Sequence, residues 1–148
     1  MCKFATVWAA FLLGAGAAFS GDITGGFSRD DTKNFVTDSV YKLMWQDGEE
    51  IFKGDYDEVV KYCENLTFAG FEDWRLPTIN ELISITDKSK FDPAINSALK
   101  NVRSDLYWSA TKDAVSASNA WIAVLKNGED GWVEAYDRNF AHCVRSEK

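Results

Sequence analysis

The spacing of apolar and polar residues changes several times along the chain, and each change marks a different kind of element. Two short runs of aromatic and aliphatic residues, 35–37 and 42–45, flank a turn at Asp38-Ser39 and predict an N-terminal hairpin. Four later runs rich in aromatic and β-branched residues predict strands at 106–111, 120–126, 132–136 and 140–145. Residues 88–105 lack such a pattern, and we expect them to be mostly loop.

Two stretches between these strands have helical spacing. The first places its apolar residues on one helix face: Tyr56, Val59, Val60, Cys63 and Leu66. Asp55 and Glu58 predict a capping box at its start, and Thr78 and Glu81 predict another at the start of a shorter helix that ends near Asp87. The order of elements therefore predicts an α+β fold with a hairpin, two helices and then a mostly antiparallel sheet.

The first residues have the pattern of an export signal. Lys3 precedes an uncharged apolar run that ends at Ala18, and small residues follow it. This run is shorter than the roughly 20 residues that a spanning helix needs, although a retained anchor is the alternative. We expect residues 1–20 to be a signal peptide for export to the periplasm or beyond the cell, without stable membrane insertion after cleavage. Residues 21–33 are expected to be a flexible lead-in, and 34–148 one domain.

The net charge limits the classes of partner, and the cysteines indicate a disulfide. The formal net charge is −7, which repels phosphate backbones and anionic lipid and argues against nucleic acid as a partner. Beyond the predicted signal the chain has two cysteines, Cys63 and Cys143. Thiols in an oxidising compartment pair unless chemistry needs them free, so we predict that these two form a disulfide.

Several short motifs occur together in a characteristic order. They are Leu43-Met44-Trp45-Gln46-Asp47, Asp73-Trp74-Arg75-Leu76-Pro77-Thr78, Glu81-Leu82, Tyr107-Trp108-Ser109, Ala120-Trp121 and Cys143-Val144-Arg145. In this order they resemble the Lcl C-terminal domain family over nearly all of residues 27–146. The resemblance implies a C-type-lectin-like fold in which a disulfide joins the first helix to the last strand. It also implies adhesion through sulfated polysaccharides, which the acidic charge of this chain does not favour.

The residues within these motifs are interpreted as structural. The four tryptophans of the motifs are expected in the core: Trp45, Trp74, Trp108 and Trp121. Arg75 is predicted to form a buried ion pair with Glu81 or another acidic neighbour, and Pro77 and Thr78 to set the start of the second helix.

A candidate ligand surface lies outside the motifs. Trp132, Glu134 and Tyr136 occupy alternate positions of one predicted strand and therefore share a face, and Arg138 follows them. An exposed indole is a common stacking platform for a sugar ring. If the protein has a ligand-binding surface, these four residues are the first candidates.

The sequence predicts neither a cofactor nor a metal site. It lacks the Glu-Pro-Asn, Gln-Pro-Asp and Trp-Asn-Asp motifs of calcium-dependent lectins. Asp130, Glu134 and Asp137 are the oxygen donors from which a calcium site would be built, and solvated surface carboxylates are the alternative. His142 is the only histidine, so a zinc site or a histidine-based triad has little to draw on. We expect it to be an ordinary strand residue on the face opposite Cys143.

These features predict an exported, non-enzymatic binding or adhesion module that recognises a glycan or a protein. One alternative is a structural subunit of a cell-envelope assembly. A lesser alternative is an oxidase of the formylglycine-generating type, which shares this fold class but needs reactive thiols.

Overall fold

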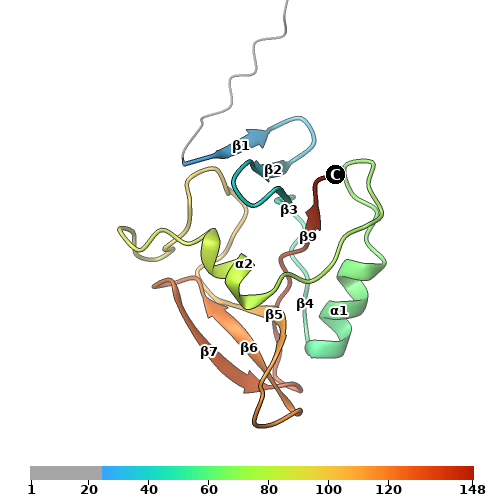
Figure 1. Ribbon diagram of the computed structural model, residues 1–148, viewed down its shortest axis with the longest axis vertical. Helices are drawn as coiled ribbons and strands as arrows, with labels where there is room; N and C mark the ends of the chain where they lie inside the picture. The colour runs from blue at the N-terminus through green and yellow to red at the C-terminus, as the bar shows by residue number, and fades with distance from the viewer. Residues whose placement is uncertain (1–24) are drawn as a thin grey trace, which may run out of the picture.

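Two β-sheets and two short helices make up the described part of the chain, residues 25–148 of a computed structural model (Figure 1). The predicted signal peptide and residues 21–24 lie outside this part. The first sheet has the order β1-β2-β3-β9, with β1 at Phe27–Asp30, β2 at Phe35–Asp38, β3 at Leu43–Gln46 and β9 at Val144–Ser146. The second has the order β4-β8-β5-β6-β7, with β4 at Lys53–Gly54, β8 at Asn139–Phe140, β5 at Leu106–Lys112, β6 at Asn119–Val124 and β7 at Glu129–Glu134.

The first sheet extends the predicted hairpin on both sides. β2 and β3 pair antiparallel as predicted, and β9 adds to the outer edge of β3. The expected lead-in at 21–33 is wrong from Phe27 to Asp30, because these residues form β1 and pair with β2. Phe27 and Arg29 alternate with Ser28 and Asp30 and are buried, so the segment has the inner and outer faces of a strand despite its Gly- and Asp-rich surroundings.

Both helices begin where their capping residues predict. Helix α1 spans Tyr56–Glu64, and α2 spans Ile79–Ser84. Each has the reciprocal hydrogen bonds of a capping box, from Asp55 and Glu58 in α1 and from Thr78 and Glu81 in α2. α2 ends before the predicted Asp87, because the next residue caps it and turns into the core. Neither helix of the described residues is long and apolar enough to cross a membrane.

The C-terminal strands differ from the prediction in two places. β7 begins at Glu129 rather than Trp132, because the turn at 125–128 is tight and the strand pairs with β6 immediately after it. The strand predicted at 140–145 is split: β8 belongs to the second sheet, whereas β9 belongs to the first. All residues from Asn139 to Arg145 are buried, so the hydrophobic pattern does not reveal where the chain crosses between sheets.

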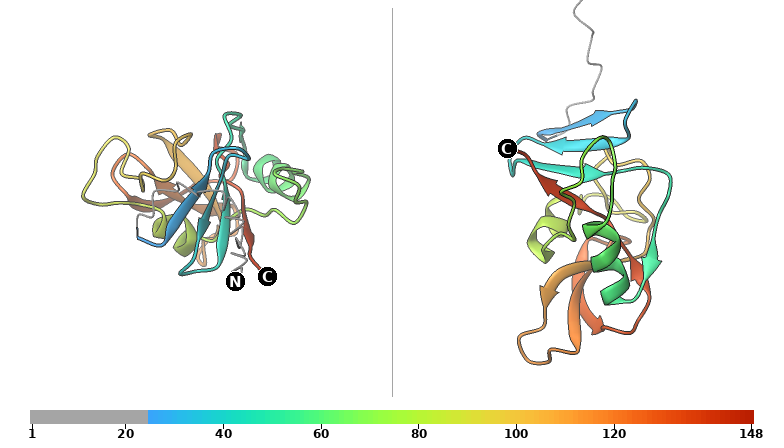
Figure 2. Two further views of the ribbon diagram at one scale, coloured as in Figure 1. Left: turned by 90° about the horizontal axis from the view of Figure 1, so that it is seen from above. Right: turned by 90° about the vertical axis from the view of Figure 1, so that its right-hand side faces the viewer.

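The predicted disulfide between Cys63 and Cys143 is present, with a Cα–Cα distance of 5.5 Å. It joins α1 to the segment directly before β9 and is completely buried. Met44, Tyr56, Val59 and Trp108 belong to the apolar cluster that surrounds it. The view from the side of α1 in Figure 2 shows this helix lying beside the strands of the second sheet, below the first sheet.

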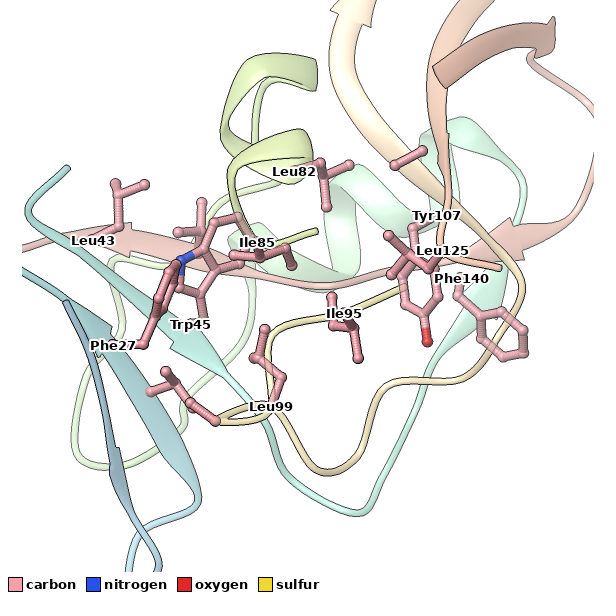
Figure 3. Close-up of a cluster of buried hydrophobic side chains, with 14 residues drawn as sticks. Phe27, Leu43, Trp45, Leu82, Ile85, Ile95, Leu99, Tyr107, Leu125 and Phe140 are labelled. Carbon is pink, nitrogen blue, oxygen red and sulfur yellow. The ribbon is translucent and has the colours of Figure 1, made fainter. Parts of the chain in front are cut away.

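A second apolar cluster joins the two sheets. Figure 3 shows Phe27, Leu43 and Trp45 of the first sheet converging with Leu82 and Ile85 from α2 and its C-terminus. The cluster continues through Ile95 and Leu99 in the loop after α2. It then reaches Tyr107 of β5, Phe140 of β8 and Leu125 in the turn after β6. The two sheets therefore share one core and do not form separate domains.

A buried ion pair ties the first sheet to the loop after α2. Arg29 donates to the carboxylate of Asp47, and their side chains are 6% and 0% exposed. The same carboxylate accepts the backbone N–H groups of Lys100 at 2.8 Å and Asn101 at 3.1 Å. The Asn101 amide in turn donates to the Asp47 carbonyl at 2.6 Å. Three segments far apart in sequence thus meet at one carboxylate, which has a donor for each of its oxygens.

Removing the cation from this pair should destabilise the fold. In an Arg29→Met variant the buried Asp47 loses its counter-ion, so we expect the free energy of unfolding to fall by about 3–5 kcal/mol. Urea denaturation followed by circular dichroism measures this difference. Lys33→Met, an exposed substitution in the same hairpin, is the matched control and should change stability by less than about 0.5 kcal/mol. A loss in Arg29→Met as small as in the control would contradict this role.

Candidate functional site

The largest exposed aromatic side chains of the second sheet lie on and just after β7. Trp132 is 56% exposed and Tyr136, in the turn that follows the strand, is 74% exposed. Glu134 between them is also exposed, whereas Val133 and Ala135 pack against the cluster around the disulfide. Exposure therefore alternates as the sequence predicts, with one face of this segment partly buried and the other in solvent. The strand itself ends at Glu134, so the prediction that it includes Tyr136 is wrong.

A second indole lies on the same face of the sheet. Trp121 of β6 is directly opposite Trp132 in the antiparallel register. The Ala135 N–H donates to the Ser118 carbonyl at 2.8 Å, so these two opposite residues form a hydrogen-bonded pair. Hydrogen-bonded and non-hydrogen-bonded pairs alternate along an antiparallel ladder, and three residues further along Trp121 and Trp132 form a non-hydrogen-bonded pair. Side chains approach closely at such pairs. The prediction that Trp121 is core is wrong, since it is only partly buried and borders the exposed face.

Arg138 does not join this surface. It donates to the Glu58 carboxylate at 2.9 Å and to the Lys53 carbonyl at 3.0 Å. Glu58 is the acceptor that caps α1, so Arg138 holds the start of that helix against β4. Of the four candidate residues, Trp132, Glu134 and Tyr136 are exposed without a side-chain ion pair among the described residues, whereas Arg138 is paired with Glu58.

The carboxylates on and after β7 are not gathered into a cluster within the described residues. Within residues 25–148 no three histidine, cysteine or acidic side chains converge closely enough to hold a metal ion, so Asp130, Glu134 and Asp137 are separate donors. Asp130 and Glu134 are exposed and form no ion pair in this part of the chain. They give the face around Trp132 a negative charge.

The family motif around Arg75 connects the two sheets. Arg75 and Glu81 form a bidentate ion pair with two contacts of 2.8 Å, as predicted, although it is partly exposed. The Arg75 backbone exchanges two hydrogen bonds with Val144 of β9. Further along, the Pro77 carbonyl accepts the N–H of Ala110 in β5 at 2.6 Å. Because this segment bonds to both sheets, its residues serve the scaffold.

Three motif tryptophans are buried as expected: Trp45, Trp74 and Trp108. Trp74 donates from its indole N–H to the carbonyls of Phe68 and Phe71, and Trp108 donates to the Gly54 carbonyl at 3.0 Å. Indoles with satisfied donors inside the core are packing elements and are not available to a ligand.

A groove beside α1 was not predicted from the sequence. Phe52 and Tyr62 stack with ring centroids 4.4 Å apart and planes 5° apart, and Lys61, Asn65 and Leu66 line the same groove. The apolar pattern places Tyr62 outside the buried stripe of α1 but does not indicate its contact with Phe52. Only the fold brings the two rings together, because they come from different elements.

His142 is buried in the link between β8 and β9. It lies 5.4 Å from the Trp45 ring and 6.1 Å from the Tyr107 ring, measured between centroids. The prediction that His142 is a strand residue is wrong, since it and Cys143 are both buried outside any strand. The two rings beside His142 belong to the cluster between the sheets, whereas Cys143 belongs to the cluster around the disulfide. Burial lowers the pKa of His142 to about 4, and the negative charge of Asp47 opposes this shift only in part.

A comparison with protein families matches the Lcl C-terminal domain to residues 34–145, which is more than half of the chain. This match includes the motifs that carry the resemblance in the sequence, and it confirms that resemblance. A comparison with curated proteins found no match.

The buried histidine should make the protein sensitive to mild acid. Unfolding exposes His142 and returns its pKa toward 6.5, so the unfolded chain binds an extra proton between about pH 6.5 and pH 4. Stability is then lost as the pH falls through this window, by up to about 3 kcal/mol. Urea denaturation at several pH values measures this loss, which should be smaller by about that amount in His142→Gln. An equally steep pH dependence in the variant would show that other groups are responsible.

Proposed function

Because the chain belongs to the Lcl C-terminal domain family, we propose that it is an exported, non-enzymatic binding module whose ligand contacts the exposed face of β7. The observation that carries the proposal is the position of Trp132. This indole is half-exposed on a strand whose other face is buried, with Trp121 opposite it and Tyr136 beyond it. Aromatic side chains held in solvent by a rigid sheet are suited to stack on a sugar ring or to pack against a partner protein.

The fold and the disulfide support export and a lectin-like architecture. A disulfide between two buried cysteines suits the oxidising compartment that the predicted signal peptide implies. Its position, from the first helix to the segment before the last strand, agrees with the C-type-lectin-like arrangement that the family resemblance implies. We include this fold and a location in the periplasm or outside the cell in the proposal.

The chemistry of the cysteines favours binding over catalysis. An oxidase of the formylglycine-generating type needs reactive thiols, but Cys63 and Cys143 are bonded to each other and buried. His142 is only 5% exposed and lies against the Trp45 and Tyr107 rings, so its imidazole is largely shielded from solvent. These features support the non-enzymatic function.

A second candidate function is a structural subunit of an envelope assembly. The observation in its favour is the turn between β2 and β3, where Val40 is 66% and Tyr41 is 63% exposed. Two adjacent apolar side chains at the tip of a hairpin suit insertion into a pocket of a neighbouring subunit. Stable oligomers or a co-purifying partner, lost in Tyr41→Ser, would favour this function.

Binding to a panel of glycans tests the main proposal. The panel contains neutral glycans, sulfated glycans and peptidoglycan fragments, each titrated calorimetrically with calcium and with a chelator. We expect saturable binding that the chelator leaves unchanged and that Trp132→Ala weakens by about tenfold or more. Phe91→Ala is the matched control, because Phe91 is an aromatic residue that is also more than half exposed but lies outside β7.

Two results would count against this proposal. Equal binding by Trp132→Ala and the wild type would place the glycan site away from β7. No binding to any glycan by a folded, disulfide-bonded sample would exclude these glycans as ligands and favour a protein partner.

A further inference from the structure

The outer edge of β7 is open. β7 is the last strand in the order β4-β8-β5-β6-β7, and among residues 25–148 it pairs only with β6. An edge strand presents a row of unpaired N–H and C=O groups, which an extended segment of another chain can bind by adding a strand.

The register shows which backbone groups face outward. The hydrogen bond from Ala135 N–H to the Ser118 carbonyl sets the phase of the ladder, so Glu129, Gly131 and Val133 point their backbone groups toward β6. Asp130 and Trp132 therefore turn both N–H and C=O away from the sheet. The next outward carbonyl, that of Glu134, accepts the N–H of Asp137 at 2.9 Å, which ends the open stretch.

The residues with outward backbone groups also share one exposed face. Asp130, Trp132 and Glu134 alternate along the strand, and all three side chains are exposed. Two carboxylates thus flank one indole at intervals of two residues. An added strand would place its own alternate side chains beside these three, because neighbouring side chains on adjacent strands lie on the same face.

A second copy of this chain does not fit the edge. Antiparallel pairing of two β7 strands about Trp132 would place Asp130 of each copy opposite Glu134 of the other. Like charges directly opposite each other destabilise a strand pair, and the net charge of −7 adds long-range repulsion. The charge of the edge therefore selects a cationic partner.

We infer that the β7 edge binds an extended peptide segment of another protein, with Lys or Arg on either side of an apolar residue at alternate positions. Its basic side chains pair with Asp130 and Glu134, and its apolar side chain packs on Trp132. The peptide becomes a sixth strand of the five-stranded sheet. This inference rests on the proposed function, because it names the class of partner that uses the face around Trp132.

Short synthetic peptides test this inference with the intact, disulfide-bonded protein. The probe is the capped peptide Thr-Lys-Thr-Leu-Thr-Lys-Thr, titrated by calorimetry and by quenching of tryptophan fluorescence. Two derivatives carry backbone N-methyl groups. The first is methylated at both Lys residues and at Leu, and the second is methylated at the Thr residues between them. In an antiparallel added strand only the first set points its N–H groups at β7, so only the first derivative should lose binding.

Charge variants test the side-chain contacts. Asp130→Asn with Glu134→Gln should weaken binding of the peptide by about threefold per carboxylate, and salt at about 0.5 M should weaken binding to the wild type. The matched control is Glu49→Gln with Glu64→Gln, which removes the same charge from two exposed positions outside β7. This control should bind as the wild type does.

Several results would overturn the inference. They are the absence of peptide binding, equal loss of binding with both N-methylated derivatives, and equal weakening in both pairs of charge variants. Titration of the same sample with the glycan panel distinguishes a failure of the peptide inference from a failure of the proposed function. A protein that binds glycan through Trp132 but no peptide overturns only the inference. A protein that binds no peptide and binds glycan equally well as Trp132→Ala overturns both.

Discussion

The buried contact between Arg29 and Asp47 is the constraint on which the two-sheet arrangement depends. A charge enclosed in the core is tolerated only when its partners are fixed, and here the partners come from β1, from the residue after β3 and from the loop after α2. Satisfying one carboxylate therefore sets the position of the first sheet against the loop that lies on the shared core. The apolar cluster between the sheets stabilises the fold through the apolar area that it buries. Buried area alone, however, does not select one arrangement of the two sheets.

The local parts of this fold follow from the sequence, while the long-range parts do not. Both helix starts follow from capping residues that are close in sequence. The disulfide follows from the presence of two cysteines beyond the predicted signal peptide. β1 was not predicted because the burial of Arg29 depends on its contact with Asp47, a residue that follows β3 and is distant in sequence. The division of 140–145 between two sheets could not be predicted either. This run is fully buried, so it has no alternation of buried and exposed residues to show which strand each residue pairs with.

Part of the candidate surface could be predicted from the sequence, because the alternation of side chains along a strand is a local property. Trp132, Glu134 and Tyr136 share exposure as their spacing indicates, but Arg138 beyond the turn contacts α1 instead. Trp121 was assigned to the core from its place in a motif, and only the register across β6 and β7 puts it beside Trp132. The other residues of the family motifs join the two sheets or pack in the core. Differences in ligand among members of the family should accordingly arise at positions outside those motifs.

The pairing of β3 with β9 also determines the order in which the fold can be completed. β3 lies near the start of the described chain, but its partner is synthesised only after both helices and the whole of the second sheet. Until then the edge of β3 is uncovered and Cys63 has no partner sulfur. A nascent chain can therefore form its hairpin and helices early, but the first sheet and the disulfide are completed only once Cys143 and β9 have emerged. The last elements of this domain to be synthesised thus join its first sheet and its first helix.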